Sequence, residues 1–231
     1  MKNYIGTKEV LAQPMTAKEA IEKGYKVNNH TDDGYEVEYK DGYKSWSPKE
    51  VFEEAYKLAE TPLDRIKIER TSLIDNINAL EVFLYSDESS KLDITTQAML
   101  EAQGKIMISY LKLLTSRSIS METGIFQRSK FNFGVAIELL ETGCILRRCS
   151  WDNKDSIIIM QNPTHLGCNA IPSIENLSEL TKNLLMKTSK YASFARQCLI
   201  INIKTGDIEP WTPSISDIFA EDWELINTQT K

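Results

Sequence analysis

Two adjacent arginines, Arg147 and Arg148, and a tryptophan three residues later, Trp151, are the residues of this chain best suited to binding chemistry. A second tryptophan-rich segment, residues 210–223, follows much later and contains Trp211. A guanidinium group pairs with phosphate through parallel hydrogen bonds, and an indole ring stacks on a nucleobase. These residue types indicate a small site for a nucleotide.

The two arginines lie on a predicted strand, residues 145–149. Alternate residues of a strand point to opposite faces, so only one arginine can line a given pocket directly, and we expect the other to be solvated. Strand parity slightly favours Arg148 for the pocket, and both are kept as candidates. In this interpretation Trp151→Ala weakens binding and leaves the fold intact. In the competing interpretation Trp151 packs in the core and both arginines are surface charges.

Groups for catalysis or metal binding are sparse, because the chain has two histidines and four cysteines and carries none of the common nucleophile, phosphate-loop or zinc-protease motifs. The set considered for zinc is Cys144, Cys149, His165 and Cys168. Residues five apart on one strand face opposite ways, which disfavours zinc between Cys144 and Cys149. Glu221 and Asp222 are interpreted as solvated or capping carboxylates. We expect no enzymatic activity, no metal and no cofactor.

The composition sets the broad class of protein. A length of 231 residues allows two or three small domains. The net charge of −6 argues against a general binder of nucleic-acid polymers, which needs a broadly basic surface. The polar N-terminus is unlike a signal peptide, and no apolar run is long enough to span a membrane. We therefore expect a cytoplasmic protein with free thiols.

Residues 1–59 predict a small α+β module. A capping box at Thr16 opens a short helix. The alternating segment 35–39 and the turn residues Asp41-Gly42 indicate a β-hairpin, and Ser47-Pro48 predicts the start of a second helix with Ser47 as its N-cap. Aromatic residues crowd this hairpin. They are interpreted as a small core with cross-strand pairs, and the alternative is a ligand platform.

Residues 62–118 predict an antiparallel helical hairpin with its turn at residues 86–93. Two apolar stripes run along the second helix. The first is Met99, Ile106, Tyr110 and Leu113, and the second is Leu100, Met107, Leu111 and Leu114. Together they are wider than one partner helix covers, and two helices alone bury too little surface. We therefore expect several copies to associate through this hairpin, and the alternative is that the hairpin docks on the neighbouring modules of its own chain.

Residues 130–227 predict a second α+β domain. Phe133, Ile137 and Leu140 form the inner face of its first helix, and Gly143 caps that helix. The predicted strands are 145–149, 156–160, 198–203 and 209–211. A polar insertion, residues 161–196, contains a helical stretch at 174–186, and insertions of this length in a small domain often border a site. The fold class predicted for the chain is α+β in three parts.

Residues 131–226 resemble the phage Thoeris anti-defence domain, the second type of that name. The matching motifs are Phe133-Gly-x-Ala-Ile-x-Leu-Leu-x-x-Gly143, Arg147-Arg-x-x-Trp151, Trp211-x-Pro213 and Asp217-Ile-Phe-Ala220-x-Asp222-Trp223. The resemblance implies a sponge without enzymatic activity, which sequesters cyclic ADP-ribose signals made by bacterial TIR proteins and in some members cyclic dinucleotides. It implies a pocket between protomers of a homo-oligomer and adds Trp211 and Asp217 to the candidate ligand-binding residues. The insertion departs from the shorter members.

Residues 64–117 resemble the helical hairpin of the phage anti-CBASS sponge, which the first type of Thoeris anti-defence protein shares. The matching motifs are Arg65-x-x-x-Glu69, Leu80-x-x-Phe83-Leu84 and Gln97-x-Met-Leu-x-x-Gln103-x-x-x-Met107-x-x-Tyr110-x-x-x-Leu114-x-x-Arg117. This resemblance implies oligomers that bind cyclic oligonucleotides, and it places Tyr110 among the ligand-binding candidates.

The function expected from the sequence is phage immune evasion by sequestration. A homo-oligomer in the cytoplasm of the infected host cell holds a cyclic ADP-ribose-type signal or a cyclic di- or trinucleotide without degrading it. A phage protein with a structural or protein-interaction role is the alternative, and an enzyme that degrades the same signals is a third, less favoured one. The resemblances leave open which cyclic nucleotide is preferred.

Overall fold

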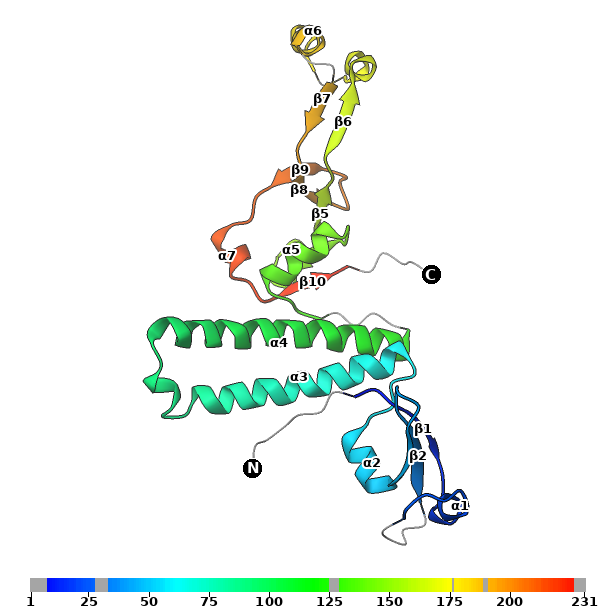
Figure 1. Ribbon diagram of the computed structural model, residues 1–231. Helices are drawn as coiled ribbons and strands as arrows, with labels where there is room; N and C mark the ends of the chain where they lie inside the picture. The colour runs from blue at the N-terminus through cyan, green and yellow to red at the C-terminus, as the bar shows by residue number, and fades with distance from the viewer. Residues whose placement is uncertain (1–7, 28–32, 125–128, 176, 189–190, 227–231) are drawn as a thin grey trace. The chain divides into compact units, whose positions relative to one another are not determined.

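The computed structural model describes residues 8–27, 33–124, 129–175, 177–188 and 191–226 (Figure 1). It confirms the predicted α+β class. The chain forms two compact units, residues 1–68 and 69–231, each described by itself below. The boundary between the units falls within a long helix, α3 (Pro62–Leu84). The three-module division stays a prediction.

Unit 1 is built on a three-stranded antiparallel sheet in the order β1-β2-β3. Its strands and helices follow the chain order β1 (Leu11–Pro14), α1 (Ala17–Glu22), β2 (Gly34–Glu38), β3 (Lys44–Pro48) and α2 (Lys49–Ala55). The capping box at Thr16 is confirmed, and so is the hairpin, with Gly42 at a positive φ of 82° in the turn. Strand β1 was missed.

The second helix of unit 1 starts one residue later than the sequence predicts. Pro48 is the N-cap of α2 and makes no side-chain cap hydrogen bond. The hydroxyl of Ser47 lies 3.4 Å from the carbonyl oxygen of Pro48 instead. The predicted Ser47 cap is therefore wrong. Ser47 is still paired with Tyr35 in the β-ladder, and a residue held in a strand cannot also take the cap position.

A buried carboxylate, Glu36 on β2, ties unit 1 together. It accepts hydrogen bonds from the Tyr25 hydroxyl at 2.7 Å, from the Gln13 amide, and from the Lys23 ammonium at 3.3 Å. These contacts, with that of Tyr25 the largest, lower the pKa of Glu36 to about 2. The carboxylate thus joins β1, β2 and the end of α1 while remaining ionised.

The predicted helical hairpin is present. Helix α3 is followed by a 3₁₀ turn, η1 (Ser89–Lys91), and by α4 (Ile94–Thr123). The side chain of Asp93 caps α4 by accepting from the Thr96 amide, and Gly124 ends the helix at a positive φ of 67°. Within unit 2 the two helices meet where Leu80 lies beside Gly104.

The C-terminal part of unit 2 is built on a five-stranded antiparallel sheet in the order β10-β4-β5-β8-β9 (Figure 1). Its elements are α5 (Phe133–Glu141), β4 (Leu146–Arg148), β5 (Ser156–Gln161), β8 (Gln197–Asn202), β9 (Ile208–Trp211), α7 (Ile215–Ile218) and β10 (Trp223–Leu225). All the strands predicted for this domain are confirmed within one or two residues. Asn132 caps α5 by accepting from the Val135 amide, and Gly143 follows the helix at a φ of 89°.

One face of this sheet carries the core, and α5 packs on it. The fully buried side chains there include Leu140 of α5, Leu146 of β4, Ile158 of β5 and Trp223 of β10. Phe133 and Ile137 pack against this cluster, as the helical pattern predicted. Strand β4, which carries both arginines, is therefore fixed by the core between β10 and β5.

The insertion folds as a structure of its own. Strands β6 (Thr164–Gly167) and β7 (Tyr191–Phe194) pair as a two-stranded sheet, with η2 (Cys168–Ser173) and α6 (Glu179–Thr188) between them. Ile171 is fully buried there. The predicted helix at 174–186 begins later, at Glu179, and the two strands were not predicted.

Candidate functional site

Four of the predicted site residues converge on the core face of the five-stranded sheet: Arg148, Trp151, Trp211 and Asp217. The rings of Trp151 and Trp211 meet edge-on with their centroids 6.4 Å apart. Both also contact the buried Trp223, at centroid distances of 5.7 and 5.8 Å. The half-buried Trp151 and Trp211 pack against the core cluster, so they contribute to folding whatever else they contact.

Arg148 is held between two carboxylates. Its Nε donates to Asp222 at 2.8 Å, and its Nη1 donates to Asp217 at 2.9 Å and to the Ser216 carbonyl at 3.2 Å. Only 15% of the side chain is exposed. Burial by itself lowers the pKa of Arg148, but hydrogen bonds to Asp217 and Asp222 outweigh it and raise that pKa. This arginine joins β4 to α7 and to the start of β10.

Asp222 holds the loop that leads to Trp151. One oxygen accepts from Arg148, and the other accepts from the Ser150 amide at 2.8 Å. Burial favours the neutral acid, yet the bonds from Ser150 and Arg148 lower the pKa of Asp222 below its usual range. The expectation that Asp222 is solvated or a helix cap is therefore wrong. Its partner is 74 residues away in the sequence.

Asp217 has two structural roles. Its carboxylate forms the capping box of α7 with Ser214, while its other oxygen accepts from Arg148. The Asp217 carbonyl accepts from the indole nitrogen of Trp223 at 3.1 Å. Burial opposes ionisation, but bonds from Ser214 and Arg148 lower the pKa of Asp217. The Asp217 carboxylate and the Arg148 guanidinium are thus mutually compensated.

Arg147 points to the opposite face of the sheet, as strand alternation predicted. Its Nε donates to Glu224 at 2.6 Å, and its Nη1 donates to the Lys154 carbonyl at 2.8 Å. Its side chain is 17% exposed and that of Glu224 is 7% exposed. The sequence therefore predicted the separation of the two arginines correctly, but neither of them is solvated.

Tyr110 belongs to the helical hairpin. Its hydroxyl donates to a carboxylate oxygen of Glu69, which joins α4 to α3. That hydrogen bond and burial raise the pKa of Tyr110. The ring is 41% exposed, so one side remains accessible in a single chain. The structure therefore gives Tyr110 a role in joining the helices.

The described residues contain no group of three or more His, Cys, Asp or Glu side chains arranged to hold a metal ion. The side chain of Cys168 lies outside those residues, whereas Cys144, Cys149 and Cys198 are free thiols. Burial is the main cause that raises the pKa of Cys149 and of Cys198. None of the helices in the described ranges has the length and hydropathy needed to cross a bilayer.

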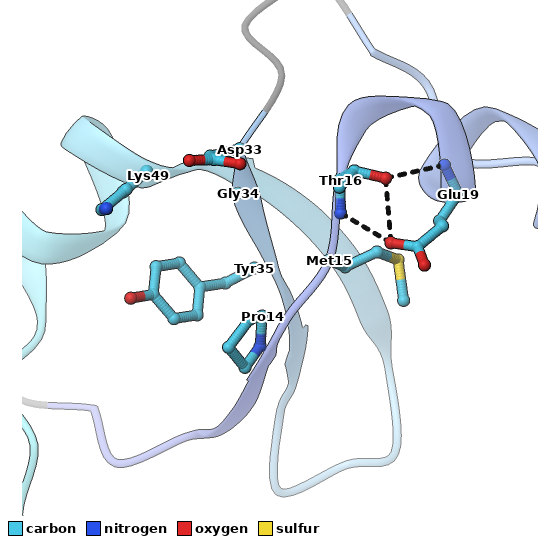
Figure 2. Close-up of a pocket in the computed structure, with 8 residues that line it drawn as sticks. All are labelled: Pro14, Met15, Thr16, Glu19, Asp33, Gly34, Tyr35 and Lys49. Atoms are coloured by element: carbon cyan, nitrogen blue, oxygen red, sulfur yellow. Dashed lines mark hydrogen bonds between the residues drawn. The ribbon is translucent and has the colours of Figure 1, made fainter.

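Unit 1 has an open pocket that the sequence did not predict, with a volume of about 410 Å³. It is lined by Pro14, Met15, Thr16, Glu19, Asp33, Gly34, Tyr35 and Lys49. Figure 2 shows that the polar groups of Thr16 and Glu19 in its wall already bond to each other in the capping box. The Tyr35 ring stacks on Phe52 of α2 with a centroid distance of 4.4 Å.

Trp223 and Glu224 were absent from the predicted site, although both are central to it. Trp223 contacts the other two indoles, and Glu224 is the partner of Arg147. Strand pairing brings Trp223 opposite Arg148 and Glu224 opposite Arg147. The available signal was the short segment after Asp222, in which an apolar residue is followed by a charged one. Local sequence does not show that this segment pairs with β4.

Two segments of the chain match known protein families. Residues 131–226 match the Thoeris anti-defense 2-like domain, and residues 60–118 match the family called Sequestin. The chain is 26% identical over 102 residues to the protein Thoeris anti-defense 2 of Bacillus phage SP01. This alignment covers 43% of the present chain and 99% of that relative.

The matched range begins at Phe131, which bridges to Trp223, and ends just after β10. It therefore includes every strand of the five-stranded sheet and all three clustered indoles. The homology supports a phage anti-Thoeris function. Residues 131–226 of this chain are thus similar to the Thoeris anti-defense 2-like domain over the whole five-stranded sheet.

Proposed function

We propose that this protein counters Thoeris defence by binding a cyclic nucleotide signal and holding it without chemical change. The observation that carries the proposal is the match of residues 131–226, together with a relative aligned over 99% of its own length. The domain supplies indole rings and guanidinium groups for a base and a phosphate. Sequestration requires a Kd near nanomolar, or about −12 kcal/mol.

The state of the ionisable groups favours binding over catalysis. Asp217 and Asp222 have lowered pKa values and are ionised near neutral pH, so they lack the proton that a general acid donates. The raised pKa of Cys149 leaves its thiol protonated and therefore a weak nucleophile. The charges of Asp217 and Asp222 are compensated within the fold by Arg148.

We further propose that the protein acts as a homo-oligomer assembled through the hairpin. Of the two apolar stripes on α4, the second is at least half-buried within the chain, whereas Met99 and Ile106 of the first are 61% and 68% exposed. An exposed apolar stripe of this kind on a long helix is a typical contact between copies. The accessible side of Tyr110 lies on the same stripe.

A depletion experiment tests the signal-binding proposal. The purified chain is incubated with cyclic ADP-ribose isomers and cyclic dinucleotides, removed by filtration and heated to release what it holds. We expect one of these nucleotides to be depleted and then recovered intact. An altered product identifies an enzyme, and the absence of depletion supports a structural or protein-interaction role.

Light scattering tests the assembly proposal, with Ile106→Glu as the variant. The buried glutamate destabilises an apolar contact, so the oligomer should dissociate at micromolar concentration. Lys105→Glu is the matched control, because it changes charge at the adjacent exposed position of α4. A monodisperse wild-type monomer contradicts the assembly proposal.

A further inference from the structure

We infer that the C-terminal half of α4 couples the helical hairpin to the five-stranded sheet, so that the two parts open and are stabilised together. The hairpin and the sheet match different families, over residues 60–118 and 131–226. The contacts between them within unit 2 nevertheless join them into one body. The inference goes beyond the proposed function, because it applies whether or not a nucleotide is bound.

Burial along α4 changes from one end of the helix to the other. Met99 and Ile106, in the N-terminal half, are 61% and 68% exposed, whereas the C-terminal half holds the buried residues, which are Leu114, Ser116 and Ser118. Two antiparallel helices leave their outer faces in water, and polar side chains normally occupy those faces. The buried serines therefore indicate that a further part of the chain covers this end of α4.

The covered face of α4 carries four residues at spacings of three and four, which place them on one side of the helix: Ser109, Lys112, Leu113 and Ser116. We call these four residues the seam. Leu113 packs against the core cluster of the sheet, and the Ser116 hydroxyl donates to that of Ser129. The Lys112 ammonium lies 3.9 Å from Glu221, and this exposed pair contributes little.

The side chain of Asn132 fastens the seam to the sheet. Its Oδ1 accepts from the Val135 amide and so caps α5, which packs on the core. Its Nδ2 donates to the Ser109 hydroxyl of α4 at 2.8 Å. The neighbouring Phe131 forms a bridge with Trp223 of β10. One amide group thus fixes the start of α5 against α4, beside a residue that is itself fixed to the sheet.

These contacts make separate opening of the two parts costly. Detaching α4 removes Leu113 from the core and leaves the part-buried Asn132 amide without its partner. The hairpin alone buries little surface, so loss of the sheet should release the hairpin as well. Free energy gained by binding at either part, whether from a ligand or from a second copy, is then shared by both.

Native-state hydrogen exchange of the full chain with Ile158→Val tests this coupling without a ligand. Ile158 is fully buried on β5, so the loss of one methylene weakens the sheet at a position outside the seam. We expect exchange to speed up by the same factor, about two- to tenfold, in β8 and in residues 98–108 of α4. The matched control is Ile208→Val, the same change at a side chain that is 58% exposed, and it should leave both rates unchanged. Faster exchange confined to the sheet overturns the inference.

A double variant, Ser109→Ala with Leu113→Ala, tests whether the seam carries the coupling. It removes the bond to Asn132 and the packing on the core, so adding Ile158→Val should now speed exchange in β8 alone, and the factor for α4 should fall to about one. Met99→Ala with Ser120→Ala, on the same helix outside the seam, is the control and should leave the coupling intact. Equal factors in both parts of the double variant contradict the role of the seam. If the double variant does not fold, the Ile158→Val comparison decides alone, and a failure in either experiment leaves the proposed function untouched.

Discussion

The two faces of the five-stranded sheet differ in how they use the same kinds of residue. On the core face α5 and the indoles of Trp151 and Trp211 surround a fully buried Trp223, and Arg148 is fixed by two carboxylates. On the second face Ile208 is more than half exposed and Arg147 has one carboxylate partner. Neighbouring arginines on one short strand thus have different environments.

The difference shows that residue type alone does not identify a ligand-binding arginine. A guanidinium enclosed by compensating carboxylates contributes to structure, because its charge is already satisfied in a partly dry site. The charged groups that contact a guanidinium therefore say more about its role than the residue type does.

The largest effect expected concerns the centre of the core face. Trp223→Ala removes a fully buried side chain with two indole contacts and a hydrogen bond, and should lower the free energy of unfolding by about 3–5 kcal/mol. Ile208→Ala on the second face should cost less than about 1 kcal/mol, since its side chain stays largely in water. Urea unfolding of the two variants measures the contrast. Similar losses contradict the view that one face carries the core.

A somewhat smaller loss is expected at the arginine of the core face. Arg148→Ala leaves Asp217 and Asp222 partly buried beside each other without a cation, which should cost about 2–4 kcal/mol. Arg196→Ala is the matched control, because the Arg196–Glu141 pair is about half exposed and should contribute under about 1 kcal/mol. Thermal unfolding followed by circular dichroism compares them. An Arg148 variant as stable as the control means that the carboxylates do not need this partner.

The third effect concerns Trp151, where the structure changes the expectation drawn from the sequence. The half-buried ring packs on Trp211 and Trp223, so Trp151→Ala should lower the free energy of unfolding by about 1–3 kcal/mol. Ligand affinity, measured below the Tm, then reports any separate role in binding. Unchanged stability restores the interpretation of Trp151 as a pocket residue outside the core.

Much of the fold was predictable because its signals are local. The caps at Thr16 and Gly143, the Asp41-Gly42 turn and the apolar helical stripes each act over a few residues, and each gives the expected element. Strand β1 was missed because it is four residues long, is exposed along its whole length and ends in Pro14, which an edge strand tolerates. The strands of the insertion lack a clear alternating pattern.

The candidate site was predictable only in part. Strand alternation correctly separated Arg147 from Arg148, because the period of a strand is a local property. Their carboxylate partners lie 77 and 74 residues away, so no local pattern could identify them. For this reason we wrongly expected one of the two arginines, and Asp222, to be solvated. The carboxylate partners of each arginine follow from the pairing of β4 with β10, which local sequence does not reveal.

The smallest effect is a dependence on pH confined to the core face. Asp217 and Asp222 have folded pKa values below the ordinary aspartate value of 3.8, so they bind protons more weakly in the folded than in the unfolded state. Their contribution to stability is therefore present above about pH 4 and is lost as pH falls through the folded values.

Asp222→Asn removes one of these groups, so the stability difference between wild type and variant should be largest near neutral pH and should shrink below about pH 4. Glu36 in unit 1 also titrates at acid pH, with a pKa of about 2, but both proteins retain it, so its effect cancels in the difference. Urea midpoints at several pH values measure this difference. A difference that stays constant down to the acid limit means that Asp222 acts through shape and hydrogen bonding alone, and that the carboxylate charge is not what holds Arg148.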